Sequence, residues 1–323
     1  MISATSLFAP LDTDLRILTD NLKKLVGTRH PILGAAAEHL FEAGGKRVRP
    51  AIVLLVARAT MPNRDLTPRH RRLAEITEMI HTASLVHDDV VDEADLRRNV
   101  PTVNSLFDNR IAVLAGDFLF AQSSWYLANL DNLEVVKLLS EVIRDFAEGE
   151  ILQGINRFDT SLSIDMYLEK SYYKTASLMA NSAKAAALLS EVSTEVAENL
   201  YNYGRNLGLA FQIVDDIFDF TGSTEILGKP TGSDLASGIV TAPVLYALEE
   251  KPFLQVLIER EFSEEGDLAK ALSAIAESKG IEKARQLATK HAHLAVESLS
   301  CLKPSTARQA LKELTEYALS RLY

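Results

Sequence analysis

An all-helical fold is predicted for this chain by the scarcity of helix breakers, by the helical spacing of its apolar residues and by the lack of alternating strand patterns. Of 323 residues, only 15 are glycine and 10 are proline, and so few breakers favour long helices. Hydrophobic residues make up 47%, which suits a globular protein with a large core. Because no short repeat or low-complexity tract divides the sequence, we predict a single domain over residues 1–323.

Proline and glycine mark the ends of the predicted helices in the first part of the chain. The first helix has leucines at helical spacing, and the second opens at Pro31 and ends at the pair Gly44-Gly45. Pro50 stands at a first helical position, where its missing N–H costs little. The polar residues 62–68 are predicted as a loop. The four helices expected here begin at residues 12, 31, 50 and 71, and the last ends at residue 92, before a break around Pro101.

Helices continue through the second part of the chain, with one glycine-rich interruption. Residues 222–238 contain four glycines and Pro230, and a loop of this kind in a helical chain often carries function. The pattern is helical again after Pro243. The other helices predicted in this part are 111–128, 133–153, 164–189 and 192–220.

The composition argues against some classes of protein. The formal net charge is −10, so we expect no nucleic-acid partner. The single cysteine, Cys301, permits no internal disulfide and suits a reducing compartment. Residues 1–10 lack the pattern of a signal peptide, and no apolar run has the length of a bilayer span. We therefore expect a cytoplasmic protein, and the sequence leaves a peripheral membrane contact open.

Two aspartate motifs of identical spacing are the most informative feature. Each has carboxylates at positions i, i+1 and i+4, so the first and last lie on one helix face, where like charges repel. Apolar residues precede both motifs, and carboxylates against an apolar wall favour a bound cation. Mg²⁺ takes a few carboxylate oxygens and leaves positions for phosphate oxygens. A solvated helix face is the alternative for one motif alone, but two copies favour metal. The motifs are Asp88, Asp89, Asp92 and Asp215, Asp216, Asp219.

A diphosphate held by metal also needs direct cations, and two basic clusters in the sequence could supply them. Lys46, Arg47 and Arg49 follow the glycine pair, and Arg97-Arg98 follow the first aspartate motif. Arginine suits phosphate because its donors form a planar fork. Taken alone, each group could be a charge cluster at a helix start or a local salt bridge. Together with the aspartates, they indicate diphosphate binding.

Several polar residues interrupt long apolar helices. His81 lies seven residues before Asp88, which is two turns along the same face. Lys174, Thr175 and Gln212 would be costly in a core without partners. A polar cavity would satisfy them, and surface exposure is the plain alternative.

In order and spacing, these motifs resemble those of the trans-isoprenyl diphosphate synthases, which make farnesyl, geranylgeranyl and longer polyprenyl diphosphates. The resemblance covers nearly the whole chain, from Gly44-Gly45-Lys46 through Gly116-Asp117 and Lys174-Thr175 to Gly228-Lys229. The segment 30–45 is similar to the cyanobacterial and plastid solanesyl-type branch. The resemblance implies a helical bundle around a central cavity, and a homodimer.

The resemblance also implies a role for each candidate residue. It implies three Mg²⁺ ions per active site, isopentenyl diphosphate and an allylic diphosphate as substrates, and a carbocation stabilised by oxygen dipoles. It assigns Asp88, Asp92, Asp215 and Asp219 to Mg²⁺, and Lys46, Arg49, His81 and Arg98 to isopentenyl diphosphate. It assigns Arg97, Lys174, Thr175, Gln212 and Lys229 to the allylic diphosphate or the cation beside it.

Small residues one turn before the first motif bear on product length. Members of the family that stop at short products tend to carry an aromatic residue there, whereas this chain has Ala83 and Ser84. We therefore expect a long all-trans product near the solanesyl length, although close helix packing is the alternative reason for small side chains. The chain also has Ile239 where many members have a lysine, which puts that cation's role in doubt.

Three alternatives remain at this level. A shorter-chain farnesyl or geranylgeranyl synthase would share every motif except the small residues before Asp88. A class I terpene cyclase on the same fold would need one strong aspartate motif and no isopentenyl site, so the residues from Gly44 to Pro50 argue against it. A non-catalytic subunit of a heteromeric synthase typically loses aspartate motifs, and this chain keeps both.

Overall fold

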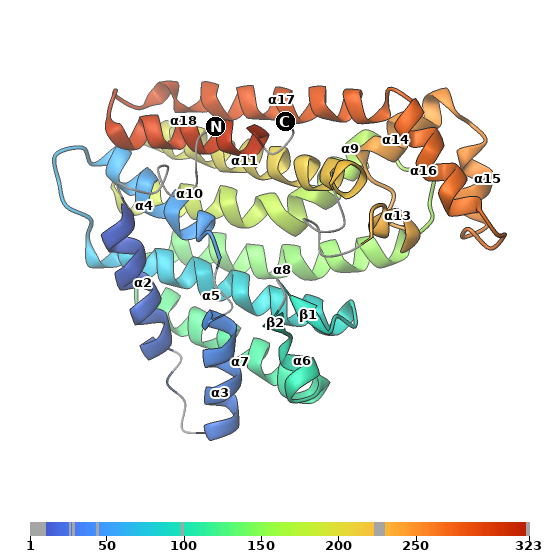
Figure 1. Cartoon of the computed structure of the whole chain (residues 1–323). Coiled ribbons are helices and arrows are strands. Elements are labelled where there is room, and N and C mark those ends of the chain that lie inside the picture. Colours follow the sequence, from blue (N-terminus) through green and yellow to red (C-terminus); the bar gives the residue numbers. More distant parts are fainter. Residues whose placement is uncertain are drawn as a thin grey trace.

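The two helices that carry the aspartate motifs are α5 (Pro68–Val91) and α11 (Thr194–Thr221), and both are predicted from the sequence within a few residues. They lie in a helical bundle in the computed structural model, which describes residues 11–25, 27, 30–42, 45–97, 100–222 and 230–320 (Figure 1). Helices make up nearly all of the regular structure in these ranges, so the all-α prediction is confirmed.

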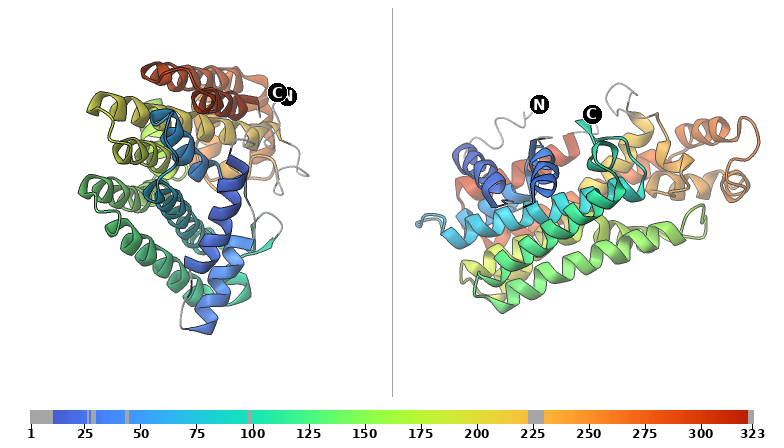
Figure 2. Two further views of the ribbon diagram at one scale, coloured as in Figure 1. Left: turned by 90° about the vertical axis from the view of Figure 1, so that its left-hand side faces the viewer. Right: turned by 90° about the horizontal axis from the view of Figure 1, so that it is seen from below.

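The remaining long helices run beside these two (Figures 1 and 2). They are α7 (Asn109–Ala128), α8 (Leu133–Ile155) and α17 (Gly280–Ser298). Shorter helices are α2 (Asp12–Leu25), α3 (Pro31–Glu42), α4 (Val48–Thr60), α6 (Val103–Leu106), α9 (Ile164–Ser171), α10 (Ser177–Leu189), α13 (Ser233–Ala236), α14 (Ala242–Glu250), α15 (Leu254–Glu259), α16 (Asp267–Glu277) and α18 (Thr306–Ser320).

Local sequence signals set the starts of the helices that carry the motifs. At α5, the Thr67 side chain accepts a hydrogen bond from the backbone N–H of His70, and Pro68 occupies the first helical position. At α11, Ser193 accepts from the N–H of Val196 in the same way. Because each cap satisfies backbone donors that would otherwise lack partners, each helix begins at a fixed residue.

The core lies between the long helices. α5 buries an apolar face that includes Ile76, Met79, Ile80 and Ala83, none of which has exposed surface. α10 is rich in buried alanines and packs closely on α11. Gly204 on α11 permits this approach, because a Cβ there would lie 2.7 Å from the Cα of Ala180.

The structure departs from the sequence prediction in two places. Residues 164–189 were predicted as one helix, but Tyr172–Ala176 form a turn of π-helix between α9 and α10. A short antiparallel hairpin, β1 (Leu96–Arg97) with β2 (Val100–Pro101), follows the first aspartate motif where only a break was expected. Both departures lie beside candidate site residues.

Helix α7 is longer and more apolar than the sequence patterns led us to expect. By length and composition it is the one helix within the described residues that could cross a membrane, although the sequence analysis expected no such run. One third of its apolar stretch is buried. Much of its apolar surface therefore remains open in a single chain.

Candidate active site

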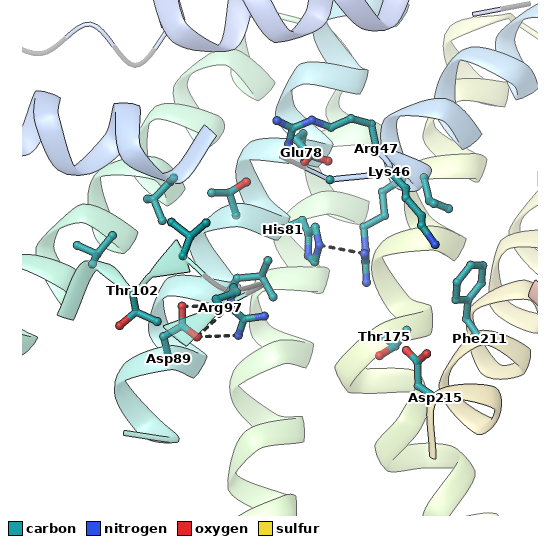
Figure 3. Close-up of a pocket in the computed structure, with 18 of the residues that line it drawn as sticks. Lys46, Arg47, Glu78, His81, Asp89, Arg97, Thr102, Thr175, Phe211 and Asp215 are labelled. Atoms are coloured by element: carbon teal, nitrogen blue, oxygen red, sulfur yellow. Dashed lines mark hydrogen bonds and ion pairs between the residues drawn. The ribbon is translucent and has the colours of Figure 1, made fainter. Parts of the chain in front are cut away.

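A cavity of about 670 Å³ opens between the start of α4, the middle of α5, the β-hairpin, the π-helical turn and α11. Six of the predicted site residues line it: Lys46, Arg49, His81, Arg97, Thr175 and Asp215. Figure 3 shows Asp89 and Arg97 on one side, Thr175 and Asp215 on the other, and His81 between them. Residues far apart in the sequence thus converge on one space.

The basic side of the cavity is built on a constrained turn. Arg47, at the start of α4, has a φ of 50°, in the left-handed region that non-glycine residues rarely adopt. Its guanidinium pairs with the nearly buried carboxylate of Glu78 on α5. This pair helps to hold the turn, which places Lys46 and Arg49 on either side of Arg47 at the cavity wall.

The two neighbouring cations have defined partners. Lys46 Nζ donates a hydrogen bond of 2.5 Å to the hydroxyl of Tyr317 on α18. Arg49 Nη1 lies 3.0 Å from His81 Nε2, so the imidazole can accept from the guanidinium. These contacts orient positive charge toward the cavity, where an anionic group would be stabilised.

The first aspartate motif ends α5. Asp92 caps the helix, and its N–H donates to the carbonyl of Asp88 at 2.8 Å. The middle residue, Asp89, is buried and holds Arg97 at three contacts of 2.8–3.1 Å. Its carboxylate therefore fixes the hairpin arginine, and the first and last carboxylates of the motif remain as metal-ligand candidates.

Burial raises the pKa of Asp88 to about 6. Lys174 and Arg97 lower this pKa, whereas the carboxylates of Glu150 and Asp92 raise it. Asp88 thus lies in a desolvated group of charges of both signs, where an added cation would favour the carboxylate form.

The second aspartate motif, on α11, uses its members differently. Asp215 lines the cavity. Asp216 is buried, which raises its pKa to about 7, although hydrogen bonds from Tyr167 and Gln212 oppose that rise. Asp219 is also buried and accepts from the Ser233 hydroxyl at 3.0 Å and the Asp234 N–H at 3.2 Å. Asp215 is therefore the member of this motif with direct access to the cavity.

The π-helical turn supplies Lys174 and Thr175. Lys174 Nζ donates to Gln153 Oε1 on α8 at 2.8 Å, and Thr175 Oγ1 donates to Gln212 Oε1 on α11 at 2.5 Å. An extra residue in a helix shifts the side chains that follow it, and such turns are frequent at functional sites. Here the π-helical turn carries two candidate residues that contact different neighbouring helices.

The donor set of the two motifs fits a hard divalent cation. Its ligands would be carboxylate oxygens, which Mg²⁺ prefers. Among the described residues no three such groups already form a closed cage. Mg²⁺ typically binds through one or two carboxylates and completes its shell with water and substrate phosphates, so an open arrangement suits a metal that binds with its substrate.

Some predicted residues lie outside the cavity wall. Asp88, Asp92, Asp219, Lys174 and Gln212 do not line it, although Gln212 contacts the lining residue Thr175. Ala83 and Ser84 do not line it either: Ala83 is fully buried, and the Ser84 hydroxyl donates to the carbonyl of His81. Arg98 and Lys229 lie outside the described residues. The backbone N–H of Ile239 donates to the carbonyl of Asp234 on α13.

Several residues of the site are not among those predicted from the sequence. Tyr317 meets Lys46 across 271 positions, and no local pattern could have identified it. Glu78 meets Arg47 from another helix. Tyr167 contacts Asp216 from α9. Glu78 alone carried a signal, as a carboxylate inside an apolar helical segment, since such a group needs a partner.

Comparisons with known proteins find similar sequences over the whole chain. The sequence model of the polyprenyl synthetase family matches residues 30–275. The chain is 73% identical to a prenyl transferase of Synechocystis sp. over the full length of both. It is 56% identical to the chloroplastic solanesyl diphosphate synthase 1 of Arabidopsis thaliana, over 99% of this chain and 80% of that one.

Solved structures are similar over the same extent. A decaprenyl diphosphate synthase from Rhodobacter capsulatus superposes with a TM-score of 0.92 at 34% identity and covers 99% of this chain and 100% of its own. A polyprenyl synthase from Caulobacter crescentus, complexed with calcium and isoprenyl diphosphate, gives a TM-score of 0.90 at 35% identity, with 98% of each chain covered.

Proposed function

The chain belongs to the polyprenyl synthetase family of prenyltransferases, and we propose that it is a long-chain all-trans polyprenyl diphosphate synthase of solanesyl type. In this reaction isopentenyl diphosphate is joined head to tail to an allylic diphosphate primer. The relatives named solanesyl diphosphate synthase support the proposed product class.

One observation carries the proposal in this chain. A cationic wall with Lys46 and Arg49 and the carboxylate of Asp215 belong to the same cavity, and the first aspartate motif closes it through the Asp89–Arg97 pair. A site for two diphosphates needs direct cations for one and metal-ligand carboxylates for the other. The cavity brings both kinds of group together.

We assign isopentenyl diphosphate to the wall formed by Lys46, Arg49 and His81. The Arg49–His81 contact at 3.0 Å holds the guanidinium and the imidazole side by side for one anion, and the Tyr317 hydroxyl orients Lys46. Arg98 is assigned here by resemblance. The allylic diphosphate is assigned to the opposite side, with Arg97, Lys174 and Lys229 as its cations.

The proposed cofactor is Mg²⁺, with three ions as the proposed number. Asp88 and Asp92 would hold it from α5, and Asp215 with Asp219 from α11. When bound, Mg²⁺ neutralises the diphosphate and makes it a better leaving group.

Residues of the chain would then stabilise the positive charge on the allylic carbon and keep water away from it. Thr175 presents its hydroxyl at the cavity wall, and its lone pairs can face a developing positive charge while its proton is donated to Gln212. The apolar side chains of Leu85, Met179 and Phe211 line the same space and exclude water from the cation.

We also propose a homodimer built on α7 and α8. α7 exposes Leu114 and Trp125, which are 11 residues and about three turns apart. α8 exposes Leu133 and Ile151, which are 18 residues and about five turns apart. Each pair lies along one helix face, and a second copy of the chain would remove this apolar surface from water.

The direct test is an assay of the purified chain alone. The chain is incubated with Mg²⁺, labelled isopentenyl diphosphate and farnesyl diphosphate, and the dephosphorylated products are separated by chromatography. We expect long all-trans alcohols, and no products when EDTA replaces Mg²⁺. Products of 20 carbons only would favour a geranylgeranyl synthase, and cyclic hydrocarbons would favour a cyclase. No product from farnesyl diphosphate would favour a farnesyl synthase or a non-catalytic subunit, and only the farnesyl synthase would then make a 15-carbon product from geranyl diphosphate.

A further inference from the structure

A tyrosine that does not line the cavity is connected to it by consecutive hydrogen bonds. Tyr167, on α9, has 1% of its surface exposed. Its hydroxyl donates to Asp216 Oδ2 at 2.6 Å. The other oxygen of Asp216 accepts from Gln212 Nε2 at 2.8 Å, and Gln212 Oε1 accepts from Thr175 Oγ1 at 2.5 Å. The series ends at Thr175, which lines the cavity.

The order of donors and acceptors along this series gives it a direction. An amide has one donating end and one accepting end. Because a carboxylate oxygen of Asp216 takes the donating end of Gln212, the accepting end must face Thr175. The Thr175 proton is then committed to Gln212, and the lone pairs of this hydroxyl are left for the cavity. Reversing the amide would set two acceptors against each other at Asp216, and burial would make that arrangement costly.

Tyr167 holds Asp216 in place, and the direction of the hydrogen bonds depends on Asp216. Asp216 is 5% exposed, so little water can replace a lost partner. With the Tyr167 hydroxyl on one oxygen, the carboxylate is held so that its other oxygen meets Gln212. Without it, Asp216 can rotate toward the neighbouring cation Lys170, which is also buried on α9.

We propose that Tyr167 is a positioning residue for ionisation of the allylic substrate. Through Asp216 and Gln212 it sets the direction of the Thr175 hydroxyl, so that an oxygen lone pair and not a proton faces the carbon that becomes positive. This inference rests on the proposed function, because it requires an allylic cation in the cavity.

The chain offers a matched control for Tyr167. Tyr203 is also fully buried, and its hydroxyl donates to the backbone carbonyl of Leu311 on α18 at 2.9 Å. Tyr167→Phe and Tyr203→Phe each remove one buried hydroxyl, and the Leu311 carbonyl keeps a second donor in the Thr315 hydroxyl at 3.2 Å. Tyr203→Phe should therefore lower the melting temperature no more than Tyr167→Phe does. The Tyr203 hydroxyl has no hydrogen bond to the series, so only Tyr167→Phe should affect the reaction.

The experiment measures the first condensation in a single turnover, with farnesyl diphosphate and isopentenyl diphosphate. We expect Tyr167→Phe to lower the rate about fivefold to tenfold, the size of one lost hydrogen bond, and to leave the KM for isopentenyl diphosphate unchanged. Tyr203→Phe should stay within about twofold of the wild type. Equal rates for the two variants would overturn the inference.

A double-variant cycle separates action through Gln212 from a general loosening of the core. In a Gln212→Leu background the series is already broken, so Tyr167→Phe should cause no further fall in rate. A further fall as large as that seen in the wild-type background would overturn the inference. A wild-type chain with no activity would instead overturn the proposed function, and this inference with it.

Discussion

At the scale of single residues, the two aspartate motifs divide their carboxylates between structure and chemistry. Asp89 holds Arg97, and Asp216 is held by Tyr167 and Gln212. The middle carboxylate of each motif thus positions other groups of the site. This explains why a motif with three aspartates does not bring three metal ligands together, since only its first and last members lie on the same helix face.

The basic wall gives the first prediction. Lys46→Ala should raise the KM for isopentenyl diphosphate about tenfold to a hundredfold, because a charge-assisted hydrogen bond contributes ~1.5–3 kcal/mol. The KM for the allylic substrate should change much less. Lys283→Ala is a suitable control, since Lys283 pairs with Glu249 on the surface. If the allylic KM alone rose, the two diphosphate sites would be reversed.

A buried histidine gives a prediction on pH and stability. His291 lies on α17, and its Nδ1 is 2.8 Å from Asn206 Oδ1. Burial, together with the nearby charges of Arg205 and Lys290, lowers its pKa to about 4. Between pH 6.5 and 4 the unfolded chain therefore binds a proton that the folded chain does not. The free energy of unfolding should fall as pH drops through this window.

Melting curves against pH test this assignment. His291→Gln keeps a neutral donor for Asn206, and it should flatten the fall in melting temperature between pH 6.5 and 4. The exposed His293 on the same helix is the control, and His293→Gln should follow the wild type. An unchanged pH profile in His291→Gln would show that other groups cause the acid instability.

Sequence reasoning predicted the ionisable residues of the site better than it predicted their contacts. The motif spacing predicted that the first and last carboxylates of each motif share one helix face, because that relation follows from helix geometry alone. The pairing of Lys46 with Tyr317 depends on how α4 and α18 pack, and no local pattern encodes that packing. The same holds for Tyr167, which meets Asp216 from another helix.

At the scale of elements, the π-helical turn is the feature that the sequence did not predict. Tyr172–Ala176 lie in a segment whose composition suits an ordinary helix, so only the neighbours can explain the extra residue. Gly149 on α8 and Gly208 on α11 approach this turn: a Cβ on Gly149 would lie 2.9 Å from the Tyr173 Cβ. The two glycines provide the room that the wider turn needs.

Filling that room should affect both stability and catalysis. In Gly208→Ala the added methyl would lie 2.5 Å from the Cα of Ala176, so we expect a loss of ~1–3 kcal/mol and a lower kcat as Thr175 is displaced. Gly154→Ala on α8 is the control, because nothing lies within 4 Å of its added Cβ and alanine favours helices. Normal kcat in a folded Gly208→Ala chain would contradict a positioning role for the turn.

At the scale of the whole molecule, the apolar surface of α7 and α8 predicts an obligate partner. Trp125→Asp should convert the dimer into a monomer in sedimentation or light scattering, because a charge would be buried at the interface. Phe253→Asp, an exposed aromatic beside α15, should remain dimeric. A wild-type chain that is monomeric at micromolar concentration would contradict the dimer.

Product length is also a property of the whole bundle, because a growing chain must pass between helices. From Asp88 back to Ile76, α5 spans 12 residues, or ~18 Å at ~1.5 Å per residue. The side chains of Ile76, Met79 and Ile80 are buried, and none of them carries an aromatic ring. Ala83 and Ser84 do not line the cavity, so a long product requires the space beside them to open during elongation.

A bulky side chain at that point should close the path. Ala83→Phe or Ser84→Phe should shorten the product to roughly farnesyl or geranylgeranyl length, as separated by chromatography of the dephosphorylated alcohols. Overpacking itself costs ~1–3 kcal/mol, so melting temperatures are measured in parallel. Ala83→Ser, which adds one atom, should keep the long product. A folded Phe variant that still made long chains would show that the product does not grow past these two residues, since a ring of that size cannot share the passage with a prenyl chain. A wild type that stopped at 20 carbons would contradict the long product itself.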